Sequence, residues 1–141
     1  MSHLFVKRKQ LQYLSEWKDR RNRKPLIIRG ARQVGKTYLV RDFAKSHFDN
    51  LIELNLELNP EKADLFASKD VDEILKMLSL DLDAEIKPGR TLLFIDEIQR
   101  APELIAFLRY FFENKPELHI IAAGSLLEFT LSDHDFSMPL G

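Results

Sequence analysis

The chain has 141 residues and a net charge of −1; 45% of its residues are hydrophobic and 30% are charged, a balance typical of one ordinary globular domain. It has no cysteine, which excludes disulfides and thiolate metal sites and makes the reducing cytoplasm its expected location. The longest apolar runs, such as LLFI at residues 92–95, are far too short to span a bilayer, and the N-terminus lacks the apolar core of a signal peptide. We therefore expect no association with membranes.

The first 24 residues are strongly basic. Eight Lys and Arg residues against two acids give this segment a charge of +6, which leaves −7 for the rest of the chain. Apolar side chains recur at near-helical spacing from Leu4 to Arg21, and Pro25 disfavours helix at the residue before it. We therefore expect a basic amphipathic helix within residues 1–24 and a separate core in residues 25–141. The charge has two open interpretations: a solvated helix face, or a contact strip for nucleic-acid phosphates or an acidic partner.

Strands and helices alternate through the rest of the chain. Asn59-Pro60 predicts the start of one short helix, and Asp70 followed by Glu73 predicts a capping box at the start of the next. The alternation predicts an α/β fold in three layers, with a parallel sheet covered by helices on both faces. Apolar runs predict strands at 26–29, 51–57, 91–95 and 118–123, and amphipathic runs predict longer helices at 37–48 and 101–114.

The sequence GARQVGKT at residues 30–37 fits the phosphate-binding pattern G-x-x-x-x-G-K-[ST] and lies between a predicted strand and a predicted helix. Glycine allows close backbone approach, and the loop N–H groups can converge on phosphate oxygens at the positive end of the helix. Lys36 would supply charge to the β- and γ-phosphates, and Thr37 would bind Mg²⁺. Arg32 is explained equally well as a phosphate contact or as a solvated loop tip. The candidate nucleotide-binding residues are Gly30, Ala31, Arg32, Gln33, Val34, Gly35, Lys36, Thr37 and Tyr38.

Two further polar positions follow apolar strands. Asp96 and Glu97 end the strand LLFI, where Asp96 would hold Mg²⁺ and Glu97 would orient the attacking water; the alternative is an acidic N-cap for the next helix. Ser125 follows the strand HIIAAG, where its hydroxyl could sense the γ-phosphate or cap a helix. Because ligands gather at the carboxyl ends of parallel strands, we expect these groups to meet the phosphate loop there. The candidate catalytic residues are Glu97, Lys36 and Ser125, and the candidate metal ligands are Thr37 and Asp96.

The segments IIRGARQVGKTYLVRDFA, LLFIDEIQRAPELIAFLRYFFE and HIIAAGSLLEF closely resemble the prokaryotic AAA-type ATPase domain, family fourteen of the AAA domains. The resemblance covers about residues 11–141. It implies a P-loop NTPase fold of the additional-strand type, binding of ATP and Mg²⁺, and ATP hydrolysis. It also implies that Lys36 and Thr37 are the Walker A residues, that Asp96 and Glu97 are the Walker B pair, and that Ser125 is the sensor-1 residue.

The chain departs from that family in length. Family members are about twice as long or more, and a C-terminal domain of unknown function usually follows the ATPase domain. The family's expected strand order is 5-1-4-3-2, and we expect this sequence to supply only strands 1 to 4, so the strand PLIIR at residues 25–29 would have an uncovered edge. We interpret the chain as a fragment that lacks any trans-acting arginine beyond Gly141. Because such an arginine can be worth about 10³–10⁵ in rate, we expect it to bind nucleotide better than it hydrolyses it.

The residues leave several functions open. The leading one is a Mg²⁺-dependent ATPase. The alternative is a nucleotide-gated switch that controls a partner, with nucleic acid and a second copy of the chain as candidate partners. Residues near Tyr13 to Trp17 are candidates for one wall of the adenine pocket.

Overall fold

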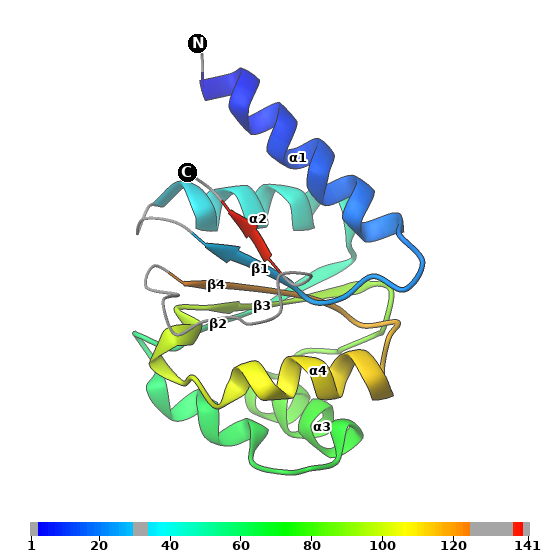
Figure 1. The fold of residues 1–141 in the computed structure, drawn as a ribbon. Helices are drawn as coiled ribbons and strands as arrows, with labels where there is room; N and C mark the ends of the chain where they lie inside the picture. The colour runs from blue at the N-terminus through cyan, green and yellow to red at the C-terminus, as the bar shows by residue number, and fades with distance from the viewer. Residues whose placement is uncertain (1–2, 30–33, 125–136, 140–141) are drawn as a thin grey trace.

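The computed structural model of the protein describes residues 3–29, 34–124 and 137–139. A five-stranded sheet runs through the middle of the molecule in the order β2-β3-β4-β1-β5, and every pairing in it is parallel (Figure 1). The predicted α/β fold is therefore confirmed. The strands are β1 (Leu26–Arg29), β2 (Asn50–Asn55), β3 (Thr91–Asp96), β4 (His119–Gly124) and β5 (Ser137–Pro139).

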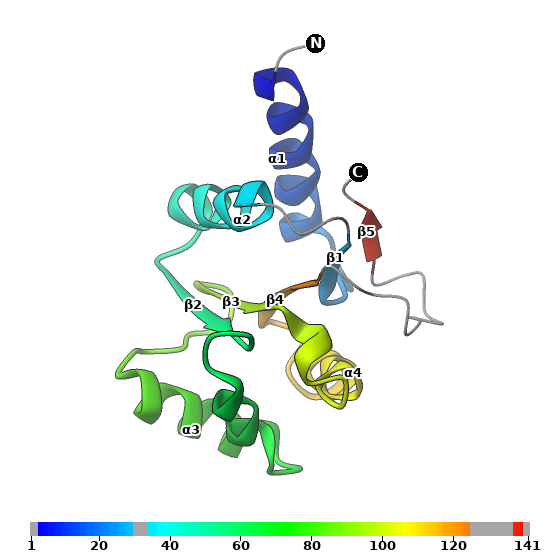
Figure 2. The ribbon, with the colours of Figure 1, turned by 90° about the vertical axis from the view of Figure 1, so that its left-hand side faces the viewer.

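Helices cover both faces of the sheet. One face carries α1 and α2, and the opposite face carries α3 and α4 (Figure 2). Two short 3₁₀ helices, η1 and η2, complete the connections after β2 and β3. The helix bounds are α1 (His3–Asp19), α2 (Val34–His47), η1 (Pro60–Phe66), α3 (Val71–Leu82), η2 (Ile98–Arg100) and α4 (Leu104–Asn114).

The central strands are buried along their whole length because both faces of the sheet are covered. Every residue of β3 and β4 is buried. Alternate side chains of β3 enter different cores: Leu93 and Ile95 pack with α3 and α4, whereas Leu92 and Phe94 pack with α1 and α2. The apolar run at 91–95 thus fixes β3 in the centre of the sheet and places the residues after it at the carboxyl edge.

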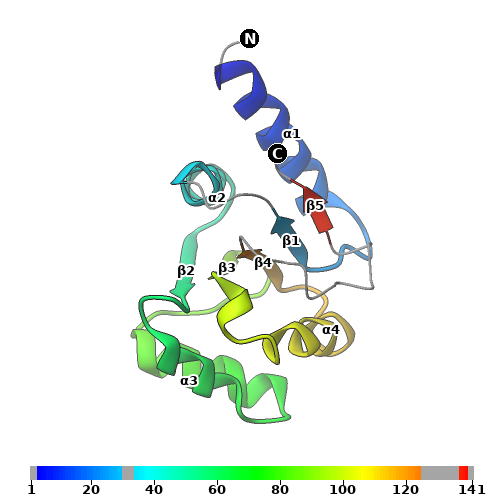
Figure 3. The same ribbon diagram turned by 60° about the vertical axis from the view of Figure 1, so that its left-hand side comes forward.

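One predicted feature of the fold is wrong. The short strand β5 pairs with β1, with Ile27 opposite Ser137 and Arg29 opposite Pro139 (Figure 3). The edge of β1 is therefore covered over these residues, and the fifth strand is present as a three-residue element. A segment this short has no readable hydrophobic period, so its strand state depends on pairing with β1.

The start of α3 also differs in detail from the predicted capping box. The Asp70 carboxylate accepts a hydrogen bond from the backbone N–H of Asp72 at 3.0 Å, as an N-cap should. The Asp70 N–H, however, donates to Ser68 Oγ at 3.0 Å, and Ser68 Oγ donates to the Glu73 carboxylate at 3.1 Å. Ser68 therefore stands between the two partners that a capping box would join directly.

Candidate nucleotide site

The carboxyl edge of the sheet brings together the two halves of the predicted site. Thr37 lies in the first turn of α2, which follows the loop after β1, and Asp96 is the last residue of β3. Thr37 Oγ1 donates a hydrogen bond to Asp96 Oδ2 at 3.2 Å, although the two residues are 59 positions apart in the sequence. The two candidate metal ligands are therefore direct neighbours.

The environment of Asp96 favours a nearby positive charge. Only 6% of Asp96 is exposed, and this burial is the largest cause that raises the pKa of its carboxyl above the usual value. The charge of Glu97 raises the pKa further, while the Thr37 hydrogen bond and the charge of Lys36 oppose the rise. Lys36 is itself buried, with 5% exposure. Without a ligand, the edge thus holds a poorly solvated carboxylate beside a buried ammonium group.

Glu97 occupies an unusual backbone conformation. Its φ of 57° and ψ of 45° lie in the left-handed region, which is uncommon outside glycine, and only 7% of the residue is exposed. It stands at the N-cap position of η2, but its side chain makes no capping hydrogen bond, so the interpretation of Glu97 as a helix cap is wrong. Asp96 Oδ1 accepts from the Glu97 N–H at 2.9 Å, but this N–H belongs to the cap residue itself and is not one of the N–H groups that an N-cap satisfies.

A glutamine contacts the Glu97 carboxylate. Gln99 Nε2 donates to Glu97 Oε2 at 2.7 Å, and Gln99 is partly buried. The sequence leaves two interpretations of Gln99 and Arg100, exposed residues of a first helical turn or reporters of the nucleotide state. Both lie in η2, where Gln99 is only partly exposed and Arg100 is exposed and pairs with Glu57 at 3.0 Å.

Gly35 leaves open space at the start of α2. A Cβ atom built on this residue would meet no heavy atom of the described residues within 4 Å, so packing against them does not require glycine here. The space lies beside Lys36, at the helix N-terminus that the phosphate pattern assigns to the ligand. A phosphate group held closely against the backbone needs a residue without a side chain at this position, and glycine meets that need.

The remaining candidates fall into three groups. Tyr38 lies on α2 and is 61% exposed, and Val34 begins that helix. Trp17 lies away from this edge: its ring packs on Phe43 and its Nε1 donates to the Lys24 carbonyl at 2.8 Å. The adenine wall near Tyr13 to Trp17 stays a prediction. The candidates outside the described residues are Gly30, Ala31, Arg32, Gln33 and Ser125.

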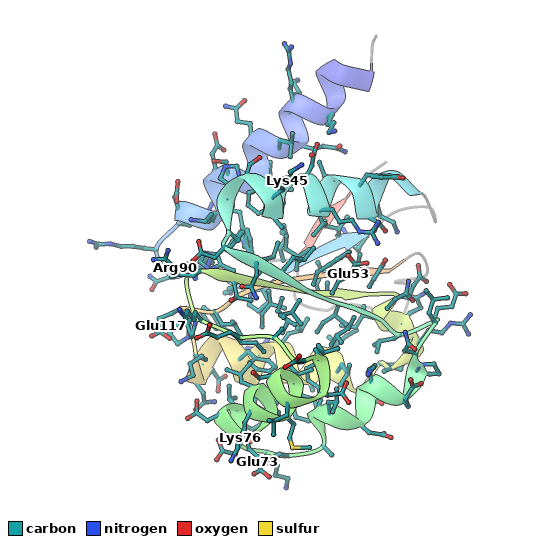
Figure 4. All side chains as sticks on the ribbon, turned by 180° about the vertical axis from the view of Figure 1, so that it is seen from behind. Lys45, Glu53, Glu73, Lys76, Arg90 and Glu117 are labelled. Carbon is teal, nitrogen blue, oxygen red and sulfur yellow. The ribbon has the colours of Figure 1, made fainter. Side chains whose placement is uncertain are left out.

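One ion pair beside the site has no signal in the sequence. Arg41, on α2, makes two hydrogen bonds to the Glu53 carboxylate on β2, at 2.9 and 2.8 Å. These bonds raise the pKa of Arg41, and the charge of Asp96 acts in the same direction. The pair joins the helix of the phosphate loop to the strand beside β3; Figure 4 shows where Glu53 lies on the sheet. Spacing along one helix predicts that Arg41 faces solvent but cannot predict a partner on another element.

The order of the strands defines the class of protein. β4 lies between β1, which leads to the phosphate loop, and β3, which ends in the acidic pair. This arrangement is that of the P-loop NTPases with an additional central strand, as the resemblance implies. The profile of the AAA domain family matches residues 22–139, and the chain belongs to that family.

Solved structures share the fold at low identity. The Orc1 protein of Aeropyrum pernix, solved in complex with DNA, matches with a TM-score of 0.62 and 15% identity over 100% of this chain and 46% of its own. A T158V variant of Thermotoga maritima RuvB matches with a TM-score of 0.60 and 20% identity over 99% of this chain and 45% of its own. A katanin structure matches with a TM-score of 0.57 and 16% identity, over 99% of this chain and 51% of the other. The chain thus spans about half the length of these structures.

None of the curated proteins matches the chain. Within the described ranges, no helix combines the length and the apolar character needed to cross a bilayer.

Proposed function

We propose that the protein binds ATP with Mg²⁺ at the carboxyl edge of the sheet and hydrolyses it to ADP and phosphate. The observation that carries this proposal is the 3.2 Å hydrogen bond between Thr37 Oγ1 and Asp96 Oδ2. It joins the helix that follows the phosphate loop to the strand that ends in the acidic pair. Membership of the AAA family and the open space at Gly35 support the same assignment.

The donor set fits Mg²⁺. Thr37 and Asp96 offer a hydroxyl and a carboxylate oxygen, the hard ligands that Mg²⁺ prefers. Among the described residues, no group of three or more His, Cys, Asp or Glu side chains could hold a metal ion without help. Mg²⁺ commonly binds through one or two side chains together with substrate phosphates, and it would supply charge neutralisation between those phosphates.

The chain's own residues would divide the remaining work. Lys36 would hold the β- and γ-phosphates, together with the N–H groups of residues 30–37 and the N-terminus of α2. Glu97 would accept a proton from the attacking water and orient it. Ser125 would sense the γ-phosphate, and residues 25–141 would form the core that carries the site.

The first test measures binding and turnover separately, on the full-length protein. Lys36→Ala should weaken ATP binding, because it removes a buried charge that faces phosphate. Glu97→Gln should leave ATP binding intact and lower single-turnover hydrolysis by about 10²-fold or more, the low end of the contribution of a general base. Equal turnover by wild type and Glu97→Gln would remove Glu97 from the catalytic role while leaving the binding assignment in place.

A nucleotide-gated switch with slow turnover is the second candidate. The contact at 2.7 Å between Gln99 Nε2 and Glu97 Oε2 favours it, because the carboxylate is already engaged before any water is bound. A switch predicts tight ADP and ATP binding, steady-state turnover far below the typical AAA rate, and a partner that distinguishes the two nucleotides. Self-assembly belongs to this proposal as well, since one structural neighbour is a katanin described by its self-assembly. Light scattering with and without ATP tests it.

A further inference from the structure

A basic hollow lies at the opposite edge of the sheet from the nucleotide site. It has a volume of about 300 Å³ and is formed where α1 turns into β1, at the end of the molecule away from the strand tips (Figure 1). No carboxylate is among its lining residues. A second hollow beside α3, by contrast, mixes Asp72 and Glu85 with two lysines. The residues that line the basic hollow include Tyr13, Trp17, Arg20, Asn22, Arg23 and Lys24.

Hydrogen bonds hold the turn that carries these cations in place. Arg23 Nη2 donates to the carbonyls of Pro116 and Glu117 at 3.1 and 3.0 Å and to His119 Nδ1 at 3.2 Å. Glu117 lies at this amino-terminal edge of the sheet, together with Arg90 (Figure 4). Trp17 Nε1 donates to the Lys24 carbonyl at 2.8 Å. The hollow is therefore a fixed shape rather than part of a flexible charged tail.

Arg20 and Tyr13 together give the hollow a cationic and aromatic surface, the Arg20–Tyr13 surface. The Arg20 guanidinium lies over the Tyr13 ring, with 5.5 Å between Cζ and the ring centroid. Arg20 is exposed. The side-chain hydrogen bonds that hold the turn to the rest of the fold come from Arg23. Guanidinium and aromatic planes of this kind are the surfaces on which unpaired bases stack.

Elsewhere on α1 and its turn, several cations are already used within the fold. Lys7 pairs with Asp42 at 2.5 Å, and Lys18 lies over the Phe48 ring at 5.2 Å. Lys24 lines the hollow and also lies over the Phe112 ring at 5.9 Å. Two acids stand near the hollow, because the charges of Glu117 and Asp19 act on Arg23. Part of the positive charge of residues 1–24 is therefore engaged within the fold, and part of it lies around the hollow.

We propose that this hollow binds a segment of single-stranded nucleic acid, with a backbone phosphate between Arg20 and Lys24 and a base stacked on the Arg20–Tyr13 surface. A free phosphate would use the cations but would gain nothing from the ring. Duplex DNA presents its bases stacked inside and could not offer a base to this surface. Because the hollow lies at the other edge of the sheet from Thr37 and Asp96, both ligands can be bound at once.

The test measures binding of a fluorescent single-stranded oligonucleotide by the full chain without nucleotide, over a series of salt concentrations. Arg20→Gln should weaken binding by about tenfold and reduce the slope of log K against log salt by about 0.7, the value for one phosphate contact on a single strand. Tyr13→Leu should weaken binding by about fivefold or more without changing that slope, since it removes stacking and no charge. Tyr13→Phe should bind as wild type does.

Arg8→Gln is the matched control. Arg8 is an exposed cation of α1, the helix that ends at Asp19 just before Arg20, and the 12 positions between the two arginines correspond to about 18 Å along the helix axis. It should reduce affinity by less than twofold. The proposal is overturned if Arg8→Gln and Arg20→Gln weaken binding equally, if Tyr13→Leu binds as wild type does, if inorganic phosphate competes as well as the oligonucleotide, or if duplex binds as tightly as single strand. Thermal unfolding of each variant checks that the fold is intact.

Discussion

Gln99 Nε2 donates a hydrogen bond of 2.7 Å to Glu97 Oε2, at the point where β3 ends and η2 begins. The partner of Glu97 therefore lies two residues away and is held by the same short helix. If Glu97 orients water, Gln99→Ala should lower kcat by about tenfold and leave the ATP dissociation constant within about twofold, because the carboxylate loses its fixed orientation but not its charge. Single-turnover and equilibrium binding measurements separate the two quantities.

Gln99→Glu tests the same contact by replacing the hydrogen-bond donor with a second negative charge. A second carboxylate beside Glu97 would repel it instead of donating a hydrogen bond to it, so Gln99→Glu should lower kcat further than Gln99→Ala does. A rise in the ATP dissociation constant that accounts for the whole loss of activity would show that Gln99 acts on binding instead.

Gly35 and Gly89 form a matched pair of glycines. A Cβ at Gly35 meets no atom of the described part of the chain within 4 Å, and the residue lies within α2. Gly35→Ala should therefore raise the free energy of unfolding by about 0.5–1 kcal/mol. It should nevertheless weaken ATP binding by tenfold or more, because the methyl group would occupy space needed by phosphate. Calorimetry of unfolding and ATP titration measure the two effects on one variant.

Gly89→Ala should show the reverse. Gly89 has a φ of +85° in the turn before β3, where an L side chain is strained. The substitution should cost about 1 kcal/mol of stability and leave ATP binding unchanged. If Gly35→Ala loses stability while ATP binding stays at the wild-type level, then the open space at Gly35 is unrelated to nucleotide.

The sequence was informative wherever a pattern is local. The four-residue strand at 26–29 is found where the apolar run predicted it, because Ile27 and Ile28 are buried by opposite faces of one sheet. The short strand β5 carries no such pattern and was missed. The same distinction holds for the contacts of the candidate site. The pairing of Thr37 with Asp96 follows from two motifs at strand ends, whereas Arg41–Glu53 and Gln99–Glu97 depend on how separate side chains meet in space, which spacing does not encode.

Asp96 is expected to cost stability in the absence of ligand. Its folded-state pKa is raised, chiefly by burial, so the folded protein binds this proton more tightly than the unfolded chain does. Its stabilising contribution is therefore present at low pH and is lost as pH rises through the folded-state pKa. At neutral pH, Asp96→Asn should raise the melting temperature of the nucleotide-free protein and abolish the effect of Mg²⁺ on ATP binding. A lower melting temperature would mean that the lost hydrogen bonds outweigh the buried charge.

His119 gives the opposite pH dependence at the other edge of the sheet. Burial, and next the charge of Arg23, lower the pKa of His119 to about 4 from its ordinary 6.5. The neutral ring accepts from Arg23 Nη2 at Nδ1 and lies 3.2 Å through Nε2 from the Lys18 carbonyl, so Nε2 carries the proton. Between pH 6.5 and 4, the unfolded chain gains a proton that the folded protein does not.

Acidification through this window should therefore lower the free energy of unfolding by about 3 kcal/mol on account of His119, with no contribution above the window. Urea unfolding of wild type and His119→Gln at a series of pH values measures the difference. The variant loses the ring contacts to Trp17 and Phe48 and should be less stable at pH 7, but its stability should fall less steeply toward pH 4. Parallel curves would mean that His119 takes up its proton at the same pH in the folded and unfolded chains, so that burial and Arg23 do not lower its pKa.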